Sequence, residues 1–207
     1  MIVLKQYGIE LRRITKNDIE LIRTWRNHPD IRSKMAYRKK ISEAEQQKWY
    51  ASIDNKYNYY FLIIVGGKKI GVINCKEVNE KDQYGEGGIF IWDEEYNGTP
   101  YPSFASLVLM DFIFNELQMG NLSFIRTLKS NKVARNYNKM LGYVLMPRQE
   151  KVDNQWYVLT KETFNKKAVN LKKAAQLFTG TEGKLIVEGE PNDKNVMLLN
   201  EYLFKLK

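Results

Sequence analysis

Few side chains in this 207-residue chain are suited to moving a proton near neutral pH. His28 is the only histidine, and an imidazole has the intrinsic pKa for that task. A histidine just before a proline at the end of a helix is usually structural, so His28 has two interpretations. A Ser-His-Asp set would have to be built on this one residue, and no group of residues has the spacing of metal ligands. The sequence therefore predicts chemistry that needs no bound metal.

Asn131 and Tyr137 form a second set of candidates, on a helix predicted for residues 131–141. Asn131 heads this helix, where its side chain can cap the free backbone N–H groups. Tyr137 lies nearly two turns further on, and its phenol is a weak acid with an ordinary pKa of about 10. Each residue also has a structural interpretation, as a cap alone and as a packed side chain of an amphipathic helix.

The segments near the N-terminus are predicted to form one strand and two helices. We expect the strand at residues 9–14 and the first helix at about 18–27, which ends where His28 precedes a proline. The second helix begins at Ser42, because a serine followed three residues later by a glutamate forms a capping box. The apolar residues of the first helix recur at helical spacing, namely Ile19, Ile22 and Trp25.

Three antiparallel strands are predicted in the middle of the chain, at residues 59–65, 68–78 and 84–92. Gly66 and Gly67 supply the tight turn between the first two strands. Further glycines interrupt the third strand, which indicates a bulge or the close approach of a ligand or another backbone.

A helix, a strand, a helix and a hairpin complete the predicted main unit. A polar loop at 93–102 leads to Ser103, which is expected to cap a helix that runs to about Leu117. The remaining elements are expected at residues 122–128, 131–141, 143–146 and 156–159. Because the helices lie between blocks of strands rather than alternating with single strands, the order predicts an α+β fold.

The chain is predicted to divide into a main domain at residues 1–160 and a C-terminal extension of helix, strand and helix at 161–207. Both helices of the extension carry apolar stripes. These are Phe164, Ala168, Leu171, Ala175 and Phe178 on the first helix, and Val196, Leu199, Leu203 and Leu206 on the last. Apolar stripes have to be buried, so we expect the extension to pack on the main domain or on a second copy of the chain in a homodimer.

The composition is that of a folded protein outside membranes. Hydrophobic residues make up 43% and aromatic residues 13%, enough for a core, which excludes intrinsic disorder. The longest apolar runs, such as 61–65, are too short to cross a bilayer, and the N-terminus shows no secretory signal. The single cysteine, Cys75, cannot form an internal disulfide, which fits a reducing compartment, so a cytoplasmic protein is expected.

Three segments match motifs of one known superfamily. Residues 131–143 read NKVARNYNKMLGY and resemble its motif N-x-x-A-x-x-x-Y-x-x-x-G-F/Y, and residues 25–32 read WRNHPDIR and resemble a WRN-P-I stretch. Residues 86–117 hold a strand, a loop and a helix where the same proteins bind a pyrophosphate. With the order of elements, these segments resemble the GNAT superfamily, in the branch of ribosomal-protein and amino-sugar-nucleotide N-acetyltransferases. The resemblance covers about residues 9–160 and implies a splayed central sheet, mixed but mostly antiparallel, flanked by helices.

The resemblance implies an acetyl-CoA-dependent N-acetyltransferase, in which a primary amine attacks the thioester directly within a ternary complex. In that family the residue that matches Asn131 contacts the pantetheine arm, and the residue that matches Tyr137 protonates the departing thiolate. Backbone N–H groups of the splayed strand, which ends near Ile91, polarise the thioester carbonyl. Acetyl-CoA is therefore the expected co-substrate.

The pyrophosphate loop departs from the family pattern Q/R-x-x-G-x-G/A, because residues 94–103 read EEYNGTPYPS. Gly98 can hold the first glycine position, but the second is Pro100, which has no N–H to offer a phosphate. Glu95 or Asn97 replaces the usual basic or amide residue, and carboxylates here would repel a pyrophosphate.

Two interpretations of this loop stay open. In the first, the loop binds the cofactor through Gly98, Thr99 and Ser103, and a proline in the first helical turn leaves the positive end of the helix dipole intact. In the second, acyl-CoA binding is lost, and the protein is a catalytically impaired GNAT-fold binding module. We favour the first interpretation, because the helix at 131–141 matches the family motif.

The sequence leaves more than one candidate interpretation for the general base and for the acceptor. Glu86 matches the place of a catalytic, acceptor-binding glutamate in some family members, and it could equally be a solvent-facing residue at a strand edge. Asn27 lies in the segment that lines the acceptor pocket in this branch, and it could equally be a capping residue. By the branch, the acceptor is an amino-sugar nucleotide, which is a small molecule, or the N-terminal amine of a protein.

The chain carries a net charge of +9, with a pI near 9.4. This charge suits a polyanionic partner such as coenzyme A, a phosphorylated acceptor or a nucleic acid, and it could equally solvate the surface. The basic residues are scattered, with short clusters at 38–40 and 166–167, and no nucleic-acid-binding motif accompanies them. A nucleic-acid-binding protein is therefore disfavoured.

Overall fold

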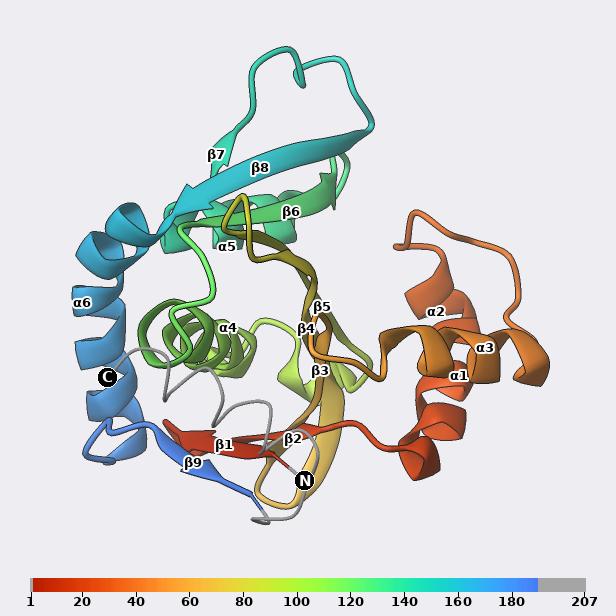
Figure 1. The fold of residues 1–207 in the computed structure, drawn as a ribbon, viewed down its shortest axis with the longest axis horizontal. Coiled ribbons are helices and arrows are strands. Elements are labelled where there is room, and N and C mark those ends of the chain that lie inside the picture. The colour runs from red at the N-terminus through yellow and green to blue at the C-terminus, as the bar shows by residue number, and fades with distance from the viewer. Residues whose placement is uncertain (1, 190–207) are drawn as a thin grey trace.

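The computed structural model describes residues 2–189, and over these residues the chain forms a nine-stranded sheet with helices on both faces (Figure 1). The strand order is β7-β8-β6-β5-β4-β3-β2-β1-β9, and all neighbours are antiparallel except β5 and β6. The strands are β1 Val3–Gln6, β2 Ile9–Arg13, β3 Tyr59–Val65, β4 Lys68–Asn79, β5 Tyr84–Ile91, β6 Leu122–Leu128, β7 Val144–Leu145, β8 Asn154–Thr160 and β9 Ile186–Glu188. The predicted α+β fold, with a mixed and mostly antiparallel sheet, is confirmed.

The helices divide between the two faces of the sheet. Figure 1 shows α1, α2 and α3 on one side of the central strands, and α4 and α6 on the other. The helices are α1 Ile19–Asn27, α2 Pro29–Arg32, α3 Glu43–Ile53, α4 Tyr101–Asp111, α5 Lys132–Leu141 and α6 Lys161–Thr179, with 3-10 turns at Lys16–Asp18 and Glu94–Tyr96 and a π turn at Phe112–Glu116 that extends α4. None of the helices within residues 2–189 is long and apolar enough to cross a membrane.

Two apolar clusters fill the spaces between the sheet and these helices. The larger cluster lies under α4 and α6 and includes Phe61 and Phe112, and the smaller lies under α1 and α3 and includes Leu62 and Ile22. Phe61 and Leu62 are neighbours on β3 that point to opposite faces, and both are fully buried. A strand that is buried on both faces has to be apolar throughout, which explains the continuous run in β3.

β1 was not predicted, and its turn explains why. The strand joins β2 through Tyr7 and Gly8, whose φ angles are +50° and +67°. Both central residues of this turn take the left-handed conformation, but Tyr7 is not a residue that signals it. The turn at Gly66 and Gly67 has the same conformation, with φ of +56° and +82°. A tight turn was predicted there from the two glycines, and the structure confirms it.

The start of α4 corrects a prediction. Ser103 is not the cap: the helix begins at Tyr101, with Pro100 at the N-cap and Pro102 in the first turn. Prolines are tolerated in these places because the first N–H groups of a helix have no intrahelical partner. The two prolines thus allow the helix to begin two residues before the serine.

β5 and β6 lie side by side over only half of β5. Residues 84–87 pair with residues 122–125. Beyond them β5 continues to Ile91 beside β4 alone, and β6 continues to Leu128 beside β8 alone. Within the described part of the chain, the backbone groups of residues 88–91 that face away from β4 have no strand partner. The sheet is therefore splayed at this point, as the resemblance implied.

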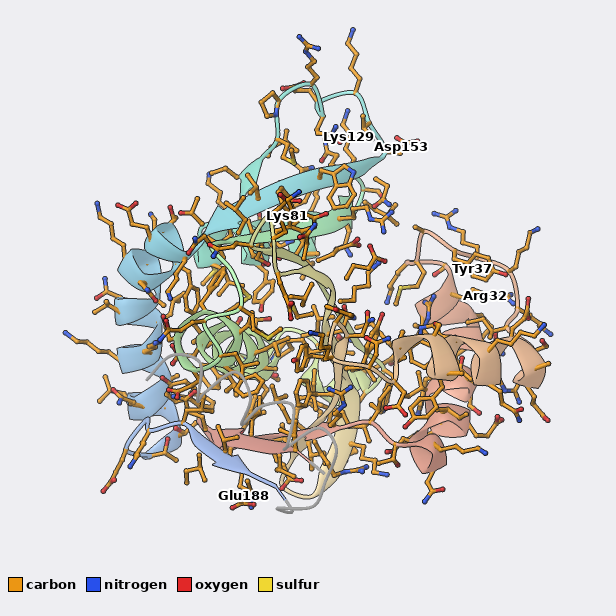
Figure 2. All side chains as sticks on the ribbon, in the orientation of Figure 1. Arg32, Tyr37, Lys81, Lys129, Asp153 and Glu188 are labelled. Carbon is orange, nitrogen blue, oxygen red and sulfur yellow. The ribbon has the colours of Figure 1, made fainter. Side chains whose placement is uncertain are left out.

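The described part of the C-terminal extension is built into the main sheet and core. α6 buries Phe164 and Ala175, and the Phe164 ring centroid lies 5.7 Å from that of Phe114. β9 pairs with β1, where Lys5 binds Glu188 at 2.7 Å, and Figure 2 shows Glu188 at this edge of the molecule. The second predicted helix of the extension, with its stripe from Val196 to Leu206, lies outside the described residues.

Candidate active site

The open edge of β5 is the first part of the candidate site. Among residues 2–189, no strand pairs with residues 88–91 on the side away from β4, so alternate residues present unpaired backbone N–H and C=O groups to the gap. Ile91, the last residue of β5, is half-buried and packs on the larger apolar cluster. A ligand in the gap could therefore bond to the strand backbone near Ile91.

The N-terminus of α4 follows β5 after a short loop and supplies few hydrogen-bond donors. Two of its first four backbone positions, Pro100 and Pro102, have no N–H. Tyr101 and Ser103 supply the other two, since the Phe104 N–H already donates to the Pro100 carbonyl at 3.0 Å. An anion at this helix end would therefore meet two backbone donors and the positive end of the dipole.

The loop between β5 and α4 is folded by its own hydrogen bonds. The Glu95 N–H donates to Asp93 Oδ1 at 3.2 Å, and the Thr99 hydroxyl donates to the Tyr96 carbonyl at 2.8 Å. Gly98 has a φ of +83°, and a Cβ there would meet nothing within 4 Å. Gly98 is thus required by the backbone turn rather than by space, and the Thr99 hydroxyl proton is already engaged.

Lys68, at the start of β4, pairs with two carboxylates of this loop and balances the charge of one of them. Its Nζ lies 2.7 Å from Asp93 Oδ2 and 2.7 Å from Glu95 Oε2, and these hydrogen bonds raise the pKa of Lys68 above its ordinary value. The repulsion of a pyrophosphate that was expected from Glu95 is therefore offset. Local sequence could not show this pairing, because Lys68 stands 27 residues before Glu95.

Tyr137 reaches from α5 to the first turn of α4. Its hydroxyl donates to the Pro102 carbonyl at 3.1 Å. The ring is partly exposed but the hydroxyl is turned inward, and burial raises the pKa of this phenol well above its ordinary value. The hydroxyl therefore keeps its proton at neutral pH, and the structure brings it beside a helix that begins 36 positions earlier, at Tyr101.

Asn131 is the cap of α5. Its side-chain oxygen accepts a hydrogen bond from the Ala134 N–H at 3.0 Å, while its amide nitrogen has no partner among the described residues. The helix is fixed to β6 by a hydrogen bond from Asn138 Nδ2 to Thr127 Oγ1 at 2.9 Å. The cap predicted from sequence is thus confirmed, and it leaves one end of the amide free for a ligand.

Glu86 lies on the opposite face of β5 from α4 and is held by two cations. Arg126 on β6 donates to it from Nε at 3.0 Å and from Nη2 at 2.9 Å, and Lys76 on β4 lies 3.2 Å away. The Arg126 guanidinium in turn covers the Trp156 ring at 4.8 Å. These ion pairs would have to open before Glu86 could take a proton from an amine.

Asn27 and His28 end α1 on the same side of the sheet. Asn27 Nδ2 donates to the Ile41 carbonyl at 2.8 Å, and its Oδ1 accepts from the Ile41 N–H at 2.7 Å. Both ends of this amide therefore tie α1 to the segment before α3. His28 is exposed at the helix end, with Nδ1 3.5 Å from a carboxylate oxygen of Asp30.

Two polar side chains on this face had no predicted role. Nη1 of Arg26 and Oδ1 of Asn74 are buried and have no hydrogen-bond partner among residues 2–189. The sequence contains one signal for a functional role of Arg26, which is its place beside Trp25 in the segment that resembles the family motif. It contains no such signal for Asn74, which lies on a predicted strand with no motif residues.

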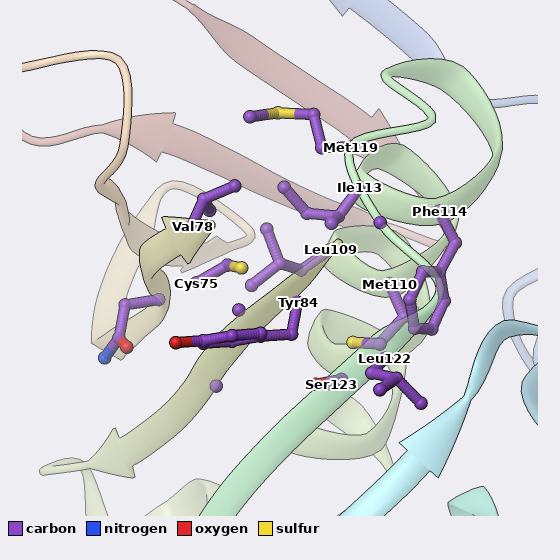
Figure 3. Close-up of a pocket in the computed structure, with 14 residues that line it drawn as sticks. Cys75, Val78, Tyr84, Leu109, Met110, Ile113, Phe114, Met119, Leu122 and Ser123 are labelled. Atoms are coloured by element: carbon purple, nitrogen blue, oxygen red, sulfur yellow. The ribbon is translucent and has the colours of Figure 1, made fainter. Parts of the chain in front are cut away.

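Apart from the open edge, the described residues form a small cavity that could hold a ligand, and they form no group of metal ligands. Figure 3 shows a cavity of about 20 Å³ lined by residues that include Cys75, Tyr84, Met110 and Ser123, with room for about one water molecule. It lies where β5 and β6 are still paired and reaches the start of the open edge, because Gly87 and Asn74, the β4 neighbour of Gly88, also line it. Within residues 2–189, no group of three or more His, Cys, Asp or Glu side chains is arranged to hold a metal ion.

The comparison with known families agrees with this geometry. Residues 9–144 match the family model of the acetyltransferase (GNAT) domain. The chain therefore belongs to the GNAT acetyltransferase family. No curated protein matches the sequence.

Solved structures share the fold at low sequence identity. Spermidine N-acetyltransferase from Vibrio cholerae, in complex with CoA and spermine, is similar with a TM-score of 0.65 and 18% identity, over 76% of this chain and 98% of that one. FdhC, a nucleotide-linked sugar GNAT, is similar with a TM-score of 0.67 and 20% identity, over 82% and 96%. RimL, a ribosomal L7/L12 α-N-protein acetyltransferase in complex with CoA, is similar with a TM-score of 0.63 and 15% identity, over 74% and 94%. These three structures establish the likeness of fold, and they are named for three different acceptors.

Proposed function

We propose that the protein transfers an acetyl group from acetyl-CoA to a primary amine. The observation that carries the proposal is the meeting of the open edge of β5, the N-terminus of α4 and the Tyr137 hydroxyl, which bonds to the first turn of α4. These parts offer backbone groups for an extended ligand, a site for an anion and a proton donor. Membership of the GNAT family supports the same reaction class.

Acetyl-CoA is proposed to bind along the gap where β5 and β6 part. The N–H groups of Tyr101 and Ser103 would bind its pyrophosphate, in a loop shaped by Gly98 and Thr99. Backbone N–H groups near Ile91 would then donate to the thioester carbonyl, where negative charge develops during attack. The free amide nitrogen of Asn131 is a further donor, which we assign to the pantetheine arm.

The proposed reaction is direct transfer within a ternary complex. The nitrogen of the neutral amine attacks the thioester carbonyl carbon, and the carbon–sulfur bond breaks. The departing thiolate takes the proton of the Tyr137 phenol, and the amine loses its own proton to a base. Glu86 is the candidate base, provided that its ion pairs with Lys76 and Arg126 open when the acceptor binds.

The acceptor is proposed to enter from the α1–α3 side of the sheet. An amino-sugar nucleotide or a protein N-terminal amine are the two candidates, and Asn27 would line the entrance by holding the segment before α3 in place. A cytoplasmic location is proposed with this function on the basis of the single cysteine, and a homodimer on the basis of the apolar stripe that the sequence predicts from Val196 to Leu206.

Calorimetric titration of the purified chain with acetyl-CoA, and with CoA alone, tests the proposal. We expect a micromolar dissociation constant, because two backbone donors and a helix dipole remain at α4. Release of free CoA thiol would then be measured with a nucleotide-linked amino sugar, a peptide with a free N-terminus and spermidine as acceptors. Absence of binding at millimolar acetyl-CoA would exclude the acetyltransferase.

The second candidate function is a GNAT-fold binding module without catalysis. The observation in its favour is the pair of prolines, Pro100 and Pro102, which remove two backbone donors where an anion would bind. This function predicts no heat of binding with acetyl-CoA and no release of thiol with any amine.

A further inference from the structure

A guanidinium without a charged partner lies on the α1–α3 side of the sheet. Nη1 of Arg26 is buried, and among residues 2–189 the structure gives this side chain one interaction, with the Phe90 ring 5.6 Å from its Cζ. The residue as a whole is half-buried, so the lost hydration is that of Nη1, and a contact with an aromatic face restores only part of it. Burial also lowers the pKa of Arg26.

A structural role does not account for Arg26. It stands in the last turn of α1, where the helix dipole favours a cation, but its Nη1 donates to no carbonyl oxygen. The other arginine of the helix, Arg23, behaves as expected for a structural residue, because its Nε and Nη2 bind the Glu20 carboxylate at 2.8 and 2.5 Å. Arg26 therefore lacks a partner that a ligand could supply.

Asn74 carries a second polar atom without a partner on the same face. Its Oδ1 is buried and makes no hydrogen bond to any described residue. Asn74 pairs with Gly88 across β4 and β5, and Gly88 is two residues from Phe90 on β5. A Cβ at Gly88 would come within 3.1 Å of Asn74 Nδ2, so the glycine leaves room for the amide to lie across β5 at its open edge.

The charged side chains beyond Gly88 balance one another. Lys76 lies 3.2 Å from Glu86 and 3.1 Å from Glu77, and Arg126 also binds Glu86, so two cations face two carboxylates there. Arg26, which has no carboxylate partner among residues 2–189, leaves this face of β4, β5 and β6 with an excess positive charge, and that charge favours an anion over a cation. A polyamine such as spermidine would be repelled by the unpaired guanidinium.

We propose that Arg26 binds an oxyanion of the acceptor, a phosphate or a carboxylate, and that Asn74 accepts a hydrogen bond from an N–H or O–H group of the same molecule. The proposal rests on the proposed function and names its acceptor class, an amine that carries negative charge. A guanidinium suits this task because its planar donors match the two oxygens of a phosphate or carboxylate. Asn74 lies beside Gly88 and Arg26 lies over Phe90, and both of these β5 residues belong to the open edge, so a bound amine would lie near the thioester.

The test measures the melting temperature of wild type and of Arg26→Met with uridine diphosphate, inorganic phosphate, succinate or spermidine, each with and without saturating CoA. Uridine diphosphate is expected to raise the melting temperature of wild type in both conditions, because its site is separate from that of CoA. Arg26→Met is expected to lose at least about tenfold in affinity for this probe, the loss of a hydrogen bond to a charged group. Its response to CoA should stay that of wild type.

Matched variants keep the result interpretable. Lys48→Gln removes an exposed cation from α3 and should bind uridine diphosphate as wild type does. Arg26→Lys keeps the charge without the planar donors and should bind with intermediate affinity, which serves as a second variant if methionine disturbs the fold.

Several outcomes overturn the anion site. They are equal binding of uridine diphosphate by wild type and Arg26→Met, binding of no anion by wild type, and stronger stabilisation by spermidine than by any anion. If the protein fails to bind acetyl-CoA while its binding of an anion depends on Arg26, the proposed acetyltransferase fails and the anion site stands. The responses to phosphate and to succinate distinguish a phosphate from a carboxylate as the preferred group.

Discussion

The Tyr137 hydroxyl is buried and donates a hydrogen bond to the Pro102 carbonyl, and both favour its protonated form, while a hydrogen bond with Ser106 acts in the opposite direction. Donation to the Pro102 carbonyl requires the proton, and the apolar surroundings disfavour a phenolate. A raised pKa makes this phenol a weaker acid than an ordinary one. It can give its proton to a thiolate, whose conjugate thiol has a pKa of about 8.5, only if bound acetyl-CoA lowers the pKa of the phenol again, and solvent then has to restore the proton.

Replacement of Tyr137 by phenylalanine is expected to lower kcat for acetyl transfer by about 10²- to 10⁴-fold, the usual contribution of a positioned acid. The dissociation constant of acetyl-CoA should not change, because the hydroxyl acts on the leaving thiolate and not on the bound thioester. Steady-state kinetics together with calorimetry separate the two effects. Tyr143→Phe is the control, since its hydroxyl is also buried but bonds to Ser123, at 2.7 Å, away from the open edge of β5. An unchanged kcat in Tyr137→Phe would show that Tyr137 only packs.

In the folded structure, two further candidate site residues have hydrogen-bond or ion-pair partners that limit what they can do in catalysis or binding. Glu86 is shared by Lys76 and Arg126, and Asn27 is bonded at both ends of its amide. Neither arrangement is visible in the local sequence. Arg26 shows the converse, because it resembles a surface residue in the sequence, yet its Nη1 is buried and has no hydrogen-bond partner among residues 2–189.

At the scale of elements, the start of α4 limits how a pyrophosphate can bind. Pro100 and Pro102 begin the helix early and fix its first turn, and they also remove two donors from the end that binds anions. Lys68 balances the charge of only one of the two loop carboxylates that bind it. The result is a weaker anion site than a loop with glycines would provide.

Pro102→Ala restores one N–H at the start of α4 and is expected to tighten acetyl-CoA binding by about tenfold, the contribution of a hydrogen bond to a charged group. The free energy of unfolding should fall by about 0.4–1 kcal/mol, because alanine leaves the unfolded chain more freedom. Calorimetric titration and chemical denaturation measure the two changes. Pro147→Ala, in the exposed loop between β7 and β8, should leave acetyl-CoA binding unchanged. Equal affinities of wild type and Pro102→Ala would place the pyrophosphate somewhere other than α4.

Elements with strong local signals were predicted well. Ser42 forms the expected capping box with Glu45, and Gly142 ends α5 with a φ of +103°. β1 and the start of α4 were missed, because one depends on a tyrosine in a left-handed turn and the other on prolines that replace a conventional cap. The errors thus lie where a turn or a helix start is formed by residue types that do not usually indicate one.

At the scale of the whole molecule, the last described strand pairs with the first strand of the chain. α6 covers the core beside α4, and β9 pairs with β1 at the edge of the sheet (Figure 1). The first helix of the extension therefore buries much of its apolar stripe within the same chain, while Phe178 at its end stays 59% exposed. We propose that residues 161–189 and the main domain unfold as one cooperative unit.

Phe164→Ala tests this cooperativity and is expected to lower the free energy of unfolding by about 3–5 kcal/mol, since the ring is fully buried against Phe114. Circular dichroism during urea denaturation should show one transition, shifted as a whole. Leu177→Ala, on the same helix but 86% exposed, is the control and should change stability by less than about 0.5 kcal/mol. A small effect of Phe164→Ala, or a separate early transition, would mean that the extension folds apart from the sheet.

The sequence by itself determined the order of most elements, the α+β class and the family motif with Asn131 and Tyr137. These depend on periodicity, caps and turns, in which each residue acts on neighbours a few positions away. Only the tertiary structure decided which side chains meet at the site. Three contacts join segments that are distant in the chain. They are the contact of Tyr137 with Pro102, the pairing of Lys68 with the loop at 93–95, and the contact of Arg26 with Phe90. Their meeting depends on strand order and on where β5 and β6 part, and no local interaction encodes either.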